Sequence, residues 1–238
     1  MIDVSGLTRL YGDLVAVDQL SFRVAPGEIM GLVGPNGAGK TTTLRSLAGI
    51  IRPTSGRITI AGADLAKDPL TAKRALAFIP DEPELFDYLT VEEHLRFVAR
   101  IYSVSDVDDR IPPLLDELEL TDKRNTLPAE LSRGMRQKLA IACGLIHDPK
   151  VLILDEPLTG LDPAGIKRMK ETIVERAGAG AAVVLSSHLL HLVEELCTQL
   201  LVLRRGHMVA YGTVTNIVAA RPDLAGLDLE DLFLALTA

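Results

Sequence analysis

Cysteine is scarce in this sequence, and basic residues are outnumbered by acidic ones. The 238 residues include two cysteines, Cys143 and Cys197, whose spacing fits no metal-binding or redox motif, so we expect buried thiols in a reducing compartment. The 32 acidic and 25 basic residues leave a formal net charge of −7. This surplus of negative charge argues against broad contacts with phosphate backbones, and we therefore expect no nucleic-acid partner.

Long hydrophobic runs are also missing. No stretch reaches the roughly 20 apolar residues that a membrane-spanning helix needs, and residues 1–5 (MIDVS) lack the basic and then apolar pattern of a secretion signal. The chain is nevertheless 47% hydrophobic and long enough to bury a full core as one large domain. We expect a protein that is soluble or held at a membrane by a partner.

The most informative stretch is the glycine-rich segment from Gly34 to Thr42, GPNGAGKTT, which matches the pattern G-x-x-x-x-G-K-[ST] at every fixed position. Its glycines let backbone N–H groups turn toward phosphate oxygens, while Lys40 can reach the outer phosphates and Thr41 can ligate Mg²⁺. An apolar strand at 28–33 precedes it, and a helix from 41 to about 48 aims its positive end at the same anion. The candidate phosphate-binding residues are Gly34, Asn36, Gly37, Gly39, Lys40, Thr41 and Thr42.

Strands and helices alternate along most of the remaining chain. Residues 2–11 and 20–24 predict an antiparallel β-layer beside the nucleotide. Further strands are expected at 57–61, 75–79, 151–156, 181–186, 200–203 and 208–211, and further helices at 131–146 and 163–176. This alternation predicts an α/β fold with a largely parallel sheet covered on both faces.

The segment from 85 to 131 lacks strand signals and is interpreted as a helical insertion. Thr90 and Glu93 form a capping-box pattern that begins one helix, and a second helix is expected around Leu114 with Pro112-Pro113 at its start. These patterns predict a single domain with a core and β-layer at about 1–84 and 138–220, a helical subdomain at about 85–137 and a tail at about 221–238.

Two carboxylates end the apolar strand at 151–156. Asp155 can hold Mg²⁺ together with Thr41, and Glu156 can accept a proton from an attacking water. A strand end with a capping acid is the alternative interpretation, but the phosphate-binding loop upstream favours nucleotide hydrolysis. The Asn-Lys-x-Asp motif of guanine-specific enzymes does not occur in the sequence, so a GTPase or a small-molecule kinase is disfavoured.

Together these motifs resemble the ATP-binding subunit of an ABC transporter, over nearly the whole chain. The glycine-rich segment is similar to the family's Walker A loop, residues 151–155 to its Walker B strand, and residues 131–135 (LSRGM) to its signature sequence. By this resemblance the catalytic candidates are Glu156, His188 and Lys40. The further ATP-contacting candidates are Tyr11 for adenine stacking, Ser132 and Gly134 of the signature, and Asp162 in a loop that crosses the dimer interface.

The resemblance implies a P-loop NTPase (RecA-like) core that uses ATP and Mg²⁺. ATP would be sandwiched in a head-to-tail dimer with a second ATP-binding subunit, identical or different, and closure would drive a separate integral membrane permease. The chain would then be cytoplasmic and peripheral on the inner face of the cell membrane. Its tail at 227–237 resembles drug- and polymer-exporting members. A soluble ABC-type ATPase that acts on a protein assembly is the alternative.

Two sites depart from the family pattern. The signature carries Arg133 and Met135 where glycine and glutamine are usual, and Asp81 stands where the family has a glutamine that contacts Mg²⁺ and water. One hypothesis is that Asp81 contributes to Mg²⁺ binding through a water molecule or tunes coupling to the partner. The other is that it is a solvated loop acid.

Overall fold

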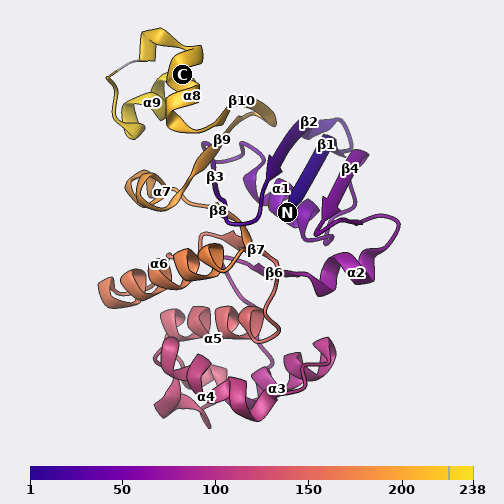
Figure 1. The fold of residues 1–238 in the computed structure, drawn as a ribbon, viewed down its shortest axis with the longest axis vertical. Helices are drawn as coiled ribbons and strands as arrows, with labels where there is room; N and C mark the ends of the chain where they lie inside the picture. The colour runs from indigo at the N-terminus through magenta and orange to yellow at the C-terminus, as the bar shows by residue number, and fades with distance from the viewer. Residues whose placement is uncertain (225, 238) are drawn as a thin grey trace.

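Six strands form the larger of two β-sheets in the computed structural model, which describes residues 1–224 and 226–237 (Figure 1). Their spatial order is β10-β9-β3-β8-β7-β6, and the neighbours run parallel except in the β9–β10 hairpin. Every residue of β3, β7 and β8 is buried, as expected for a parallel sheet covered on both faces. The strands are β3 (Ile29–Val33), β6 (Leu76–Ile79), β7 (Val151–Asp155), β8 (Ala182–Ser186), β9 (Gln199–Arg204) and β10 (His207–Gly212).

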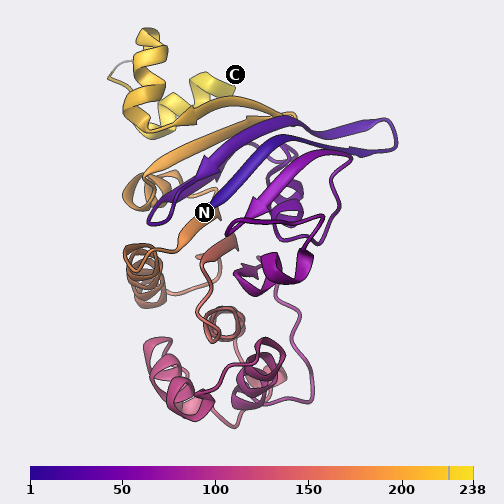
Figure 2. The same ribbon diagram turned by 45° about the vertical axis from the view of Figure 1, so that its right-hand side comes forward.

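A second, antiparallel sheet has the order β2-β1-β4-β5. In β2, Leu20, Phe22 and Val24 are buried whereas Ser21 and Arg23 are exposed, which confirms the predicted half-buried strand. The β1–β2 hairpin projects beyond the rest of its sheet (Figure 2). The short strand β5 has no counterpart in the sequence prediction. The strands are β1 (Ile2–Tyr11), β2 (Leu14–Val24), β4 (Ser55–Ile60) and β5 (Ala63–Asp64).

Helices cover both faces of the larger sheet. Helix α1 (Lys40–Leu47) buries Leu44 and Leu47 in a core that it shares with β1, β3 and β9. The opposite face is covered by α5, α6, α7 and α9. The remaining bounds are α2 (Pro69–Arg74), α5 (Arg133–Leu145), α6 (Pro163–Gly178), α7 (Leu190–Leu196), α8 (Val214–Ala220) and α9 (Leu229–Thr237), with 3₁₀ turns at Thr121–Lys123, Pro128–Glu130 and Pro222–Leu224. Within residues 1–224 and 226–237, no helix is both long enough and apolar enough to cross a membrane.

Helices α3 (Val91–Tyr102) and α4 (Val107–Glu117) lie with α5 at the end of the molecule opposite α8 and α9 (Figure 1). The hydroxyl of Thr90 accepts a hydrogen bond from the Glu93 N–H at 3.3 Å, and the Glu93 carboxylate accepts one from the Thr90 N–H at 2.8 Å. The predicted capping box at the start of α3 is therefore confirmed.

The prediction that Pro112 and Pro113 begin the second helix is wrong. Helix α4 begins at Val107, so both prolines lie in its interior. They cannot donate hydrogen bonds to the carbonyls of Asp108 and Asp109, four residues earlier. Both aspartates are exposed, so water can satisfy these carbonyls while the opposite face of the helix stays buried.

Glu92, in the first turn of α3, binds the segment after α4 through an ion pair with Arg124 and also pairs with Arg96. The hydrogen bonds from Arg124, with a smaller contribution from Arg96, lower the pKa of Glu92 from its ordinary 4.5 to about 2. Because the pKa is lowered in the folded state, the ion pairs stabilise the fold fully above the ordinary pKa. This contribution is lost as the pH falls from about 4.5 toward 2.

We expect Glu92→Gln to lower the free energy of unfolding near neutral pH, and the difference from wild type to shrink as the pH falls through about 4. Urea denaturation at a series of pH values measures both quantities. Glu84→Gln removes an exposed carboxylate of the preceding loop and serves as the control, with little expected effect. A deficit in Glu92→Gln that is the same in acid as at neutral pH would contradict the assignment.

Candidate active site

The glycine-rich loop between β3 and α1 depends on two close approaches to its neighbours. Gly39 has a φ angle of 104°, and a Cβ atom there would lie 2.5 Å from the carbonyl oxygen of Ala16 in β2. A Cβ atom on Gly34 would lie 2.5 Å from the carbonyl oxygen of Leu203 in β9. Both positions therefore require glycine.

The turn between β9 and β10 supports the same loop from outside the motif. The Gly206 N–H donates to the carbonyl of Ala38 at 2.9 Å, and the backbone N–H of Asp18 in β2 donates to the carbonyl of Gly206 at 2.9 Å. Sequence patterns do not predict this support, because the turn lies far along the chain and carries no motif of its own.

Lys40 lies over the glycine-rich loop. Its ammonium donates to the carbonyl of Gly34 at 2.7 Å and to that of Pro35 at 3.4 Å. Burial lowers the pKa of Lys40, and the carboxylates of Glu156 and Asp155 act in the opposite direction. The lysine and the two carboxylates therefore belong to one electrostatic site.

Asp155 and Glu156 lie at the carboxyl end of β7. Asp155 is buried and accepts a 2.6 Å hydrogen bond from the hydroxyl of Ser186, at the end of the adjacent β8. The same hydroxyl accepts a hydrogen bond from the Glu156 N–H at 3.1 Å. Glu156 has a φ angle of 51°, a left-handed conformation that is uncommon for a residue other than glycine and typical of strained functional turns. Sequence reasoning missed Ser186, which becomes recognisable only once β7 and β8 are known to pair.

His188 follows β8 and lies beside Glu156. Its Nδ1 is 2.8 Å from Glu156 Oε2, and its backbone N–H donates to the same oxygen at 3.3 Å. A carboxylate can only accept, so Nδ1 carries the proton in this contact. The Glu156 side chain is 17% exposed and the His188 side chain 61%. The predicted catalytic residues Glu156 and His188 are thus in contact, with Asp155 and Lys40 close by.

The signature residues contact the loop that follows β7. Ser132 caps α5 by accepting a 3.2 Å hydrogen bond from the backbone of the first turn. A Cβ atom on Gly134 would lie 2.9 Å from the carbonyl oxygen of Gly160, so glycine lets the two segments touch. Asp162 caps α6 by accepting a 2.9 Å hydrogen bond from the Gly165 N–H. Contacts of Ser132, Gly134 and Asp162 with ATP stay predictions.

Tyr11 ends β1, on the projecting hairpin of Figure 2. Its side chain is exposed, and the guanidinium of Arg9 lies 4.5 Å from the centre of its ring. A cation at this distance interacts favourably with the ring and helps to fix it. The ring is accessible to a base, and its role in adenine stacking stays a prediction.

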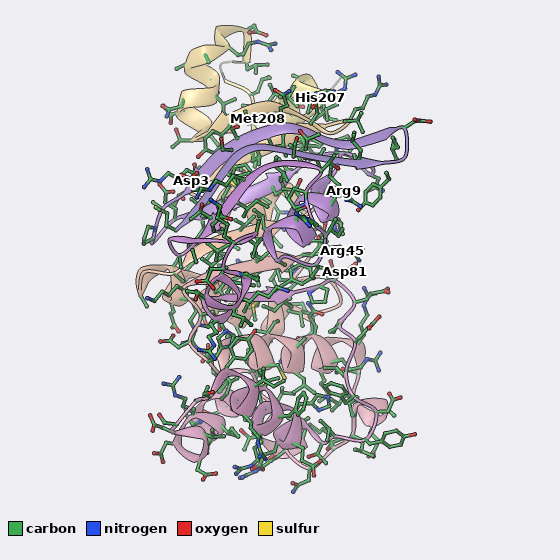
Figure 3. All side chains as sticks on the ribbon, turned by 90° about the vertical axis from the view of Figure 1, so that its right-hand side faces the viewer. Asp3, Arg9, Arg45, Asp81, His207 and Met208 are labelled. Atoms are coloured by element: carbon green, nitrogen blue, oxygen red, sulfur yellow. The ribbon has the colours of Figure 1, made fainter. Side chains whose placement is uncertain are left out.

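Asp81 follows β6 and lies, along the long axis of the molecule, between the sheets and helices α3 and α4 (Figure 3). Its Oδ1 is 3.4 Å from a terminal guanidinium nitrogen of Arg133, so two positions that depart from the family pattern form an ion pair. Gln137 of α5 donates to the carbonyl of Pro80 at 3.3 Å and holds the same loop. The role of Asp81 in Mg²⁺ binding stays a prediction.

The residues at the site fit a complex of Mg²⁺ with a nucleotide. The Thr41 hydroxyl and the Asp155 carboxylate are hard oxygen ligands, which Mg²⁺ combines with substrate phosphates and water. Asn36, Gly37 and Thr41 are exposed, so phosphates can approach the loop. In the part of the chain that the structure describes, no three His, Cys, Asp or Glu side chains are grouped to hold a metal by themselves. An ion held jointly with phosphates does not require such a group.

Comparisons with known proteins agree with this site. The family described as ABC transporter matches residues 17–159. The chain is 36% identical over 239 residues to the ABC-type transporter ATP-binding protein EcsA of Bacillus subtilis (strain 168), covering 100% of this chain and 96% of that protein. It is 37% identical over 234 residues to Nod factor export ATP-binding protein I of Paraburkholderia xenovorans (strain LB400), covering 98% of this chain and 76% of that protein.

Two solved structures share the fold. An ATP-binding subunit of an ABC transporter matches with a TM-score of 0.95 at 38% identity, covering 100% of both chains. An ATP-binding cassette solved as a dimer with ADP and Pi in a post-hydrolysis state matches with a TM-score of 0.82 at 23% identity, covering 90% of this chain and 99% of that one.

The chain belongs to the ABC transporter family. Within that family it is an ATP-binding subunit, an ATPase, and the predicted P-loop fold of ABC ATPase type is confirmed.

We expect Ser186→Ala to lower the free energy of unfolding by about 1–3 kcal/mol and to reduce ATP turnover. The substitution leaves the buried Asp155 carboxylate without its hydroxyl donor and removes one acceptor from the Glu156 N–H. Urea denaturation and steady-state ATPase assays measure the two effects. Ser187→Ala is the matched control, because the hydrogen bond that its hydroxyl accepts comes from the Leu189 N–H and not from the segment that bears Asp155 and Glu156. Wild-type stability and turnover in Ser186→Ala would contradict the assignment.

Proposed function

We propose that this chain binds ATP and Mg²⁺ at residues 34–42 and hydrolyses ATP in a head-to-tail dimer whose closure drives a separate membrane permease. The observation that carries the proposal is the 2.8 Å contact between His188 and Glu156, at the end of the strand that bears Asp155. It supports the proposal because a proton-accepting carboxylate, a ring able to meet a phosphate and a candidate metal ligand share one edge of the sheet.

Each residue then has a defined task in hydrolysis. Lys40 and the N–H groups of the loop hold the phosphates in line for attack. Glu156 orients the attacking water and accepts its proton, and His188 keeps that carboxylate oriented through Nδ1. Thr41 and Asp155 would hold Mg²⁺, which would neutralise charge on the phosphate oxygens.

The signature helix is the reason for proposing a dimer. Ser132 and Gly134 lie at the N-terminal end of α5, which carries partial positive charge and is suited to an anion. In a head-to-tail pair this end meets the γ-phosphate held by the other chain. In a pair of identical chains, the N-terminal end of α5 of each copy would meet the phosphate site of the other, as in a closed symmetric dimer. Loss of the γ-phosphate removes the shared ligand and reopens the pair.

An exposed aromatic patch beside the Asp81 loop is the surface that we assign to the permease. Phe86 is 54% exposed, Tyr88 91% and Phe97 42%. The Phe86 ring packs edge-on against Phe97 with centroids 5.1 Å apart, and the Phe86 N–H donates to a ring nitrogen of His94 at 2.9 Å. Phe86 and Phe97 thus hold each other in place, and Tyr88 adds a third exposed ring. Exposed aromatic side chains are typical of the anchors of a protein interface.

Export is the direction of transport that we propose. The relative from Paraburkholderia xenovorans is named as an export protein and is 37% identical to this chain. The tail whose sequence resembles that of exporting members forms α9, which packs on the core through Leu229, Leu232 and Leu236. The permease would hold the chain on the inner face of the cell membrane.

We expect Glu156→Gln to form a dimer of this chain when ATP is added, because ATP remains bound when the proton acceptor is removed. Its turnover should fall by about 100-fold or more. Light scattering coupled to size exclusion measures the mass, and an ATPase assay measures the turnover.

Two controls accompany this test. Adding Lys40→Ala to Glu156→Gln should abolish the dimer because it removes the charge that holds the outer phosphates. ADP in place of ATP should leave the chain monomeric. If Glu156→Gln binds ATP and stays a monomer at saturation, the pairing of two copies is wrong.

A further inference from the structure

Arg133 and Asp81 are separate departures in the sequence, but their side chains meet in the fold. Arg133 is the first residue of α5 and Asp81 follows β6, and the closest approach of guanidinium nitrogen and carboxylate oxygen is 3.4 Å. Their side chains are 54% and 42% exposed, so the pair lies at the surface that the signature presents. The sequence alone gives no reason to connect the two departures, because 52 positions separate Asp81 from Arg133 along the chain.

The stem of Arg133 also lies against the loop that follows β7. A Cβ atom on Gly160 would be 3.2 Å from Arg133 Cδ and Nε, and Gly160 has a φ angle of 80°, which glycine adopts without strain. One side chain therefore spans three segments: the signature, the loop at Gly160 and the loop at Asp81. These are the segments on which the resemblance places partner and metal contacts.

A second contact ties the Asp81 loop to the same helix. Gln137, four residues after Arg133 and thus on the same side of α5, is buried and donates to the carbonyl of Pro80 at 3.3 Å. The loop is consequently attached to α5 at Pro80, through the amide of Gln137, and at Asp81, through the ion pair with Arg133.

We propose that Arg133 and Asp81 form a positioning pair that aligns the start of the signature helix with the loops at Gly160 and Asp81. Asp81 then acts through Arg133 and not as a ligand of Mg²⁺. This inference rests on the proposed function, because alignment matters only if the signature meets ATP across a dimer.

The test is a double-mutant cycle of Asp81→Asn, Arg133→Gln and the double variant. Steady-state assays measure kcat, KM and the Mg²⁺ concentration that gives half-maximal turnover. Glu82→Gln, which removes an exposed carboxylate next to Asp81, is the matched control. The same cycle in the Glu156→Gln background measures dimerisation with ATP by light scattering, and a fluorescent ADP analogue measures nucleotide affinity of the monomer.

We expect each single variant to lower kcat and ATP-dependent dimerisation by about two- to fivefold, the range of a half-exposed ion pair. The double variant should be no worse than the poorer single variant, because both remove one interaction. Monomer affinity for the ADP analogue and the Mg²⁺ midpoint should stay at wild-type values. This separation of kcat from nucleotide affinity would not follow from a general loss of stability.

Three results would overturn the inference. Effects of the two single variants that multiply in the double variant would show that the residues act independently. A raised Mg²⁺ midpoint in Asp81→Asn, absent from Arg133→Gln, would assign Asp81 to the metal. Single variants indistinguishable from Glu82→Gln would show a solvated pair with no role. Failure of the Glu156→Gln parent to dimerise is a different outcome, since it counts against the proposed function itself.

Discussion

The adjacency of β3, β8 and β7 in the parallel sheet is the constraint on which the active site depends. Parallel neighbours end at the same edge, and ligands bind at the carboxyl ends of such strands. The register pairs Ser186 of β8 with Leu32 of β3 on one side and with Asp155 of β7 on the other. The glycine-rich loop, the carboxylates and His188 therefore meet at one edge although long segments of chain separate them.

Backbone packing, more than side-chain bonding, fixes the glycine-rich loop. The carbonyls of Ala16 and Leu203 lie where side chains at Gly39 and Gly34 would otherwise be, and the Gly206 N–H fixes the loop between them. Because these contacts come from strands of both sheets, the conformation of the loop is held by the packing of the whole fold. A receptor for phosphate that is organised in advance loses little freedom when its ligand binds.

Features encoded in local sequence were predictable, and features made by distant segments were not. The glycine-rich loop, the capping box at Thr90 and the carboxylates at the end of β7 follow from short patterns with a direct physical meaning. The hydrogen bonds of the Ser186 hydroxyl and the ion pair of Arg133 with Asp81 form only when strands and helices pack. The interior prolines of α4 show the reverse case, in which burial of one helix face outweighs a local signal for a helix start.

The segment that contains Asp81 leaves the carboxyl end of β6, next to the end of β7 that bears Asp155, and continues to Phe86 and Tyr88 of the aromatic patch. Closure of a dimer can therefore be transmitted to the surface that we assign to a permease. Gentle detergent extraction of native membranes, followed by capture of this chain and of a Tyr88→Ser variant, tests that claim most directly. We expect a polytopic membrane protein in stoichiometric yield with the wild type and much less with the variant. Recovery of both chains only from the soluble fraction, with a protein assembly and no membrane partner, would contradict the claim.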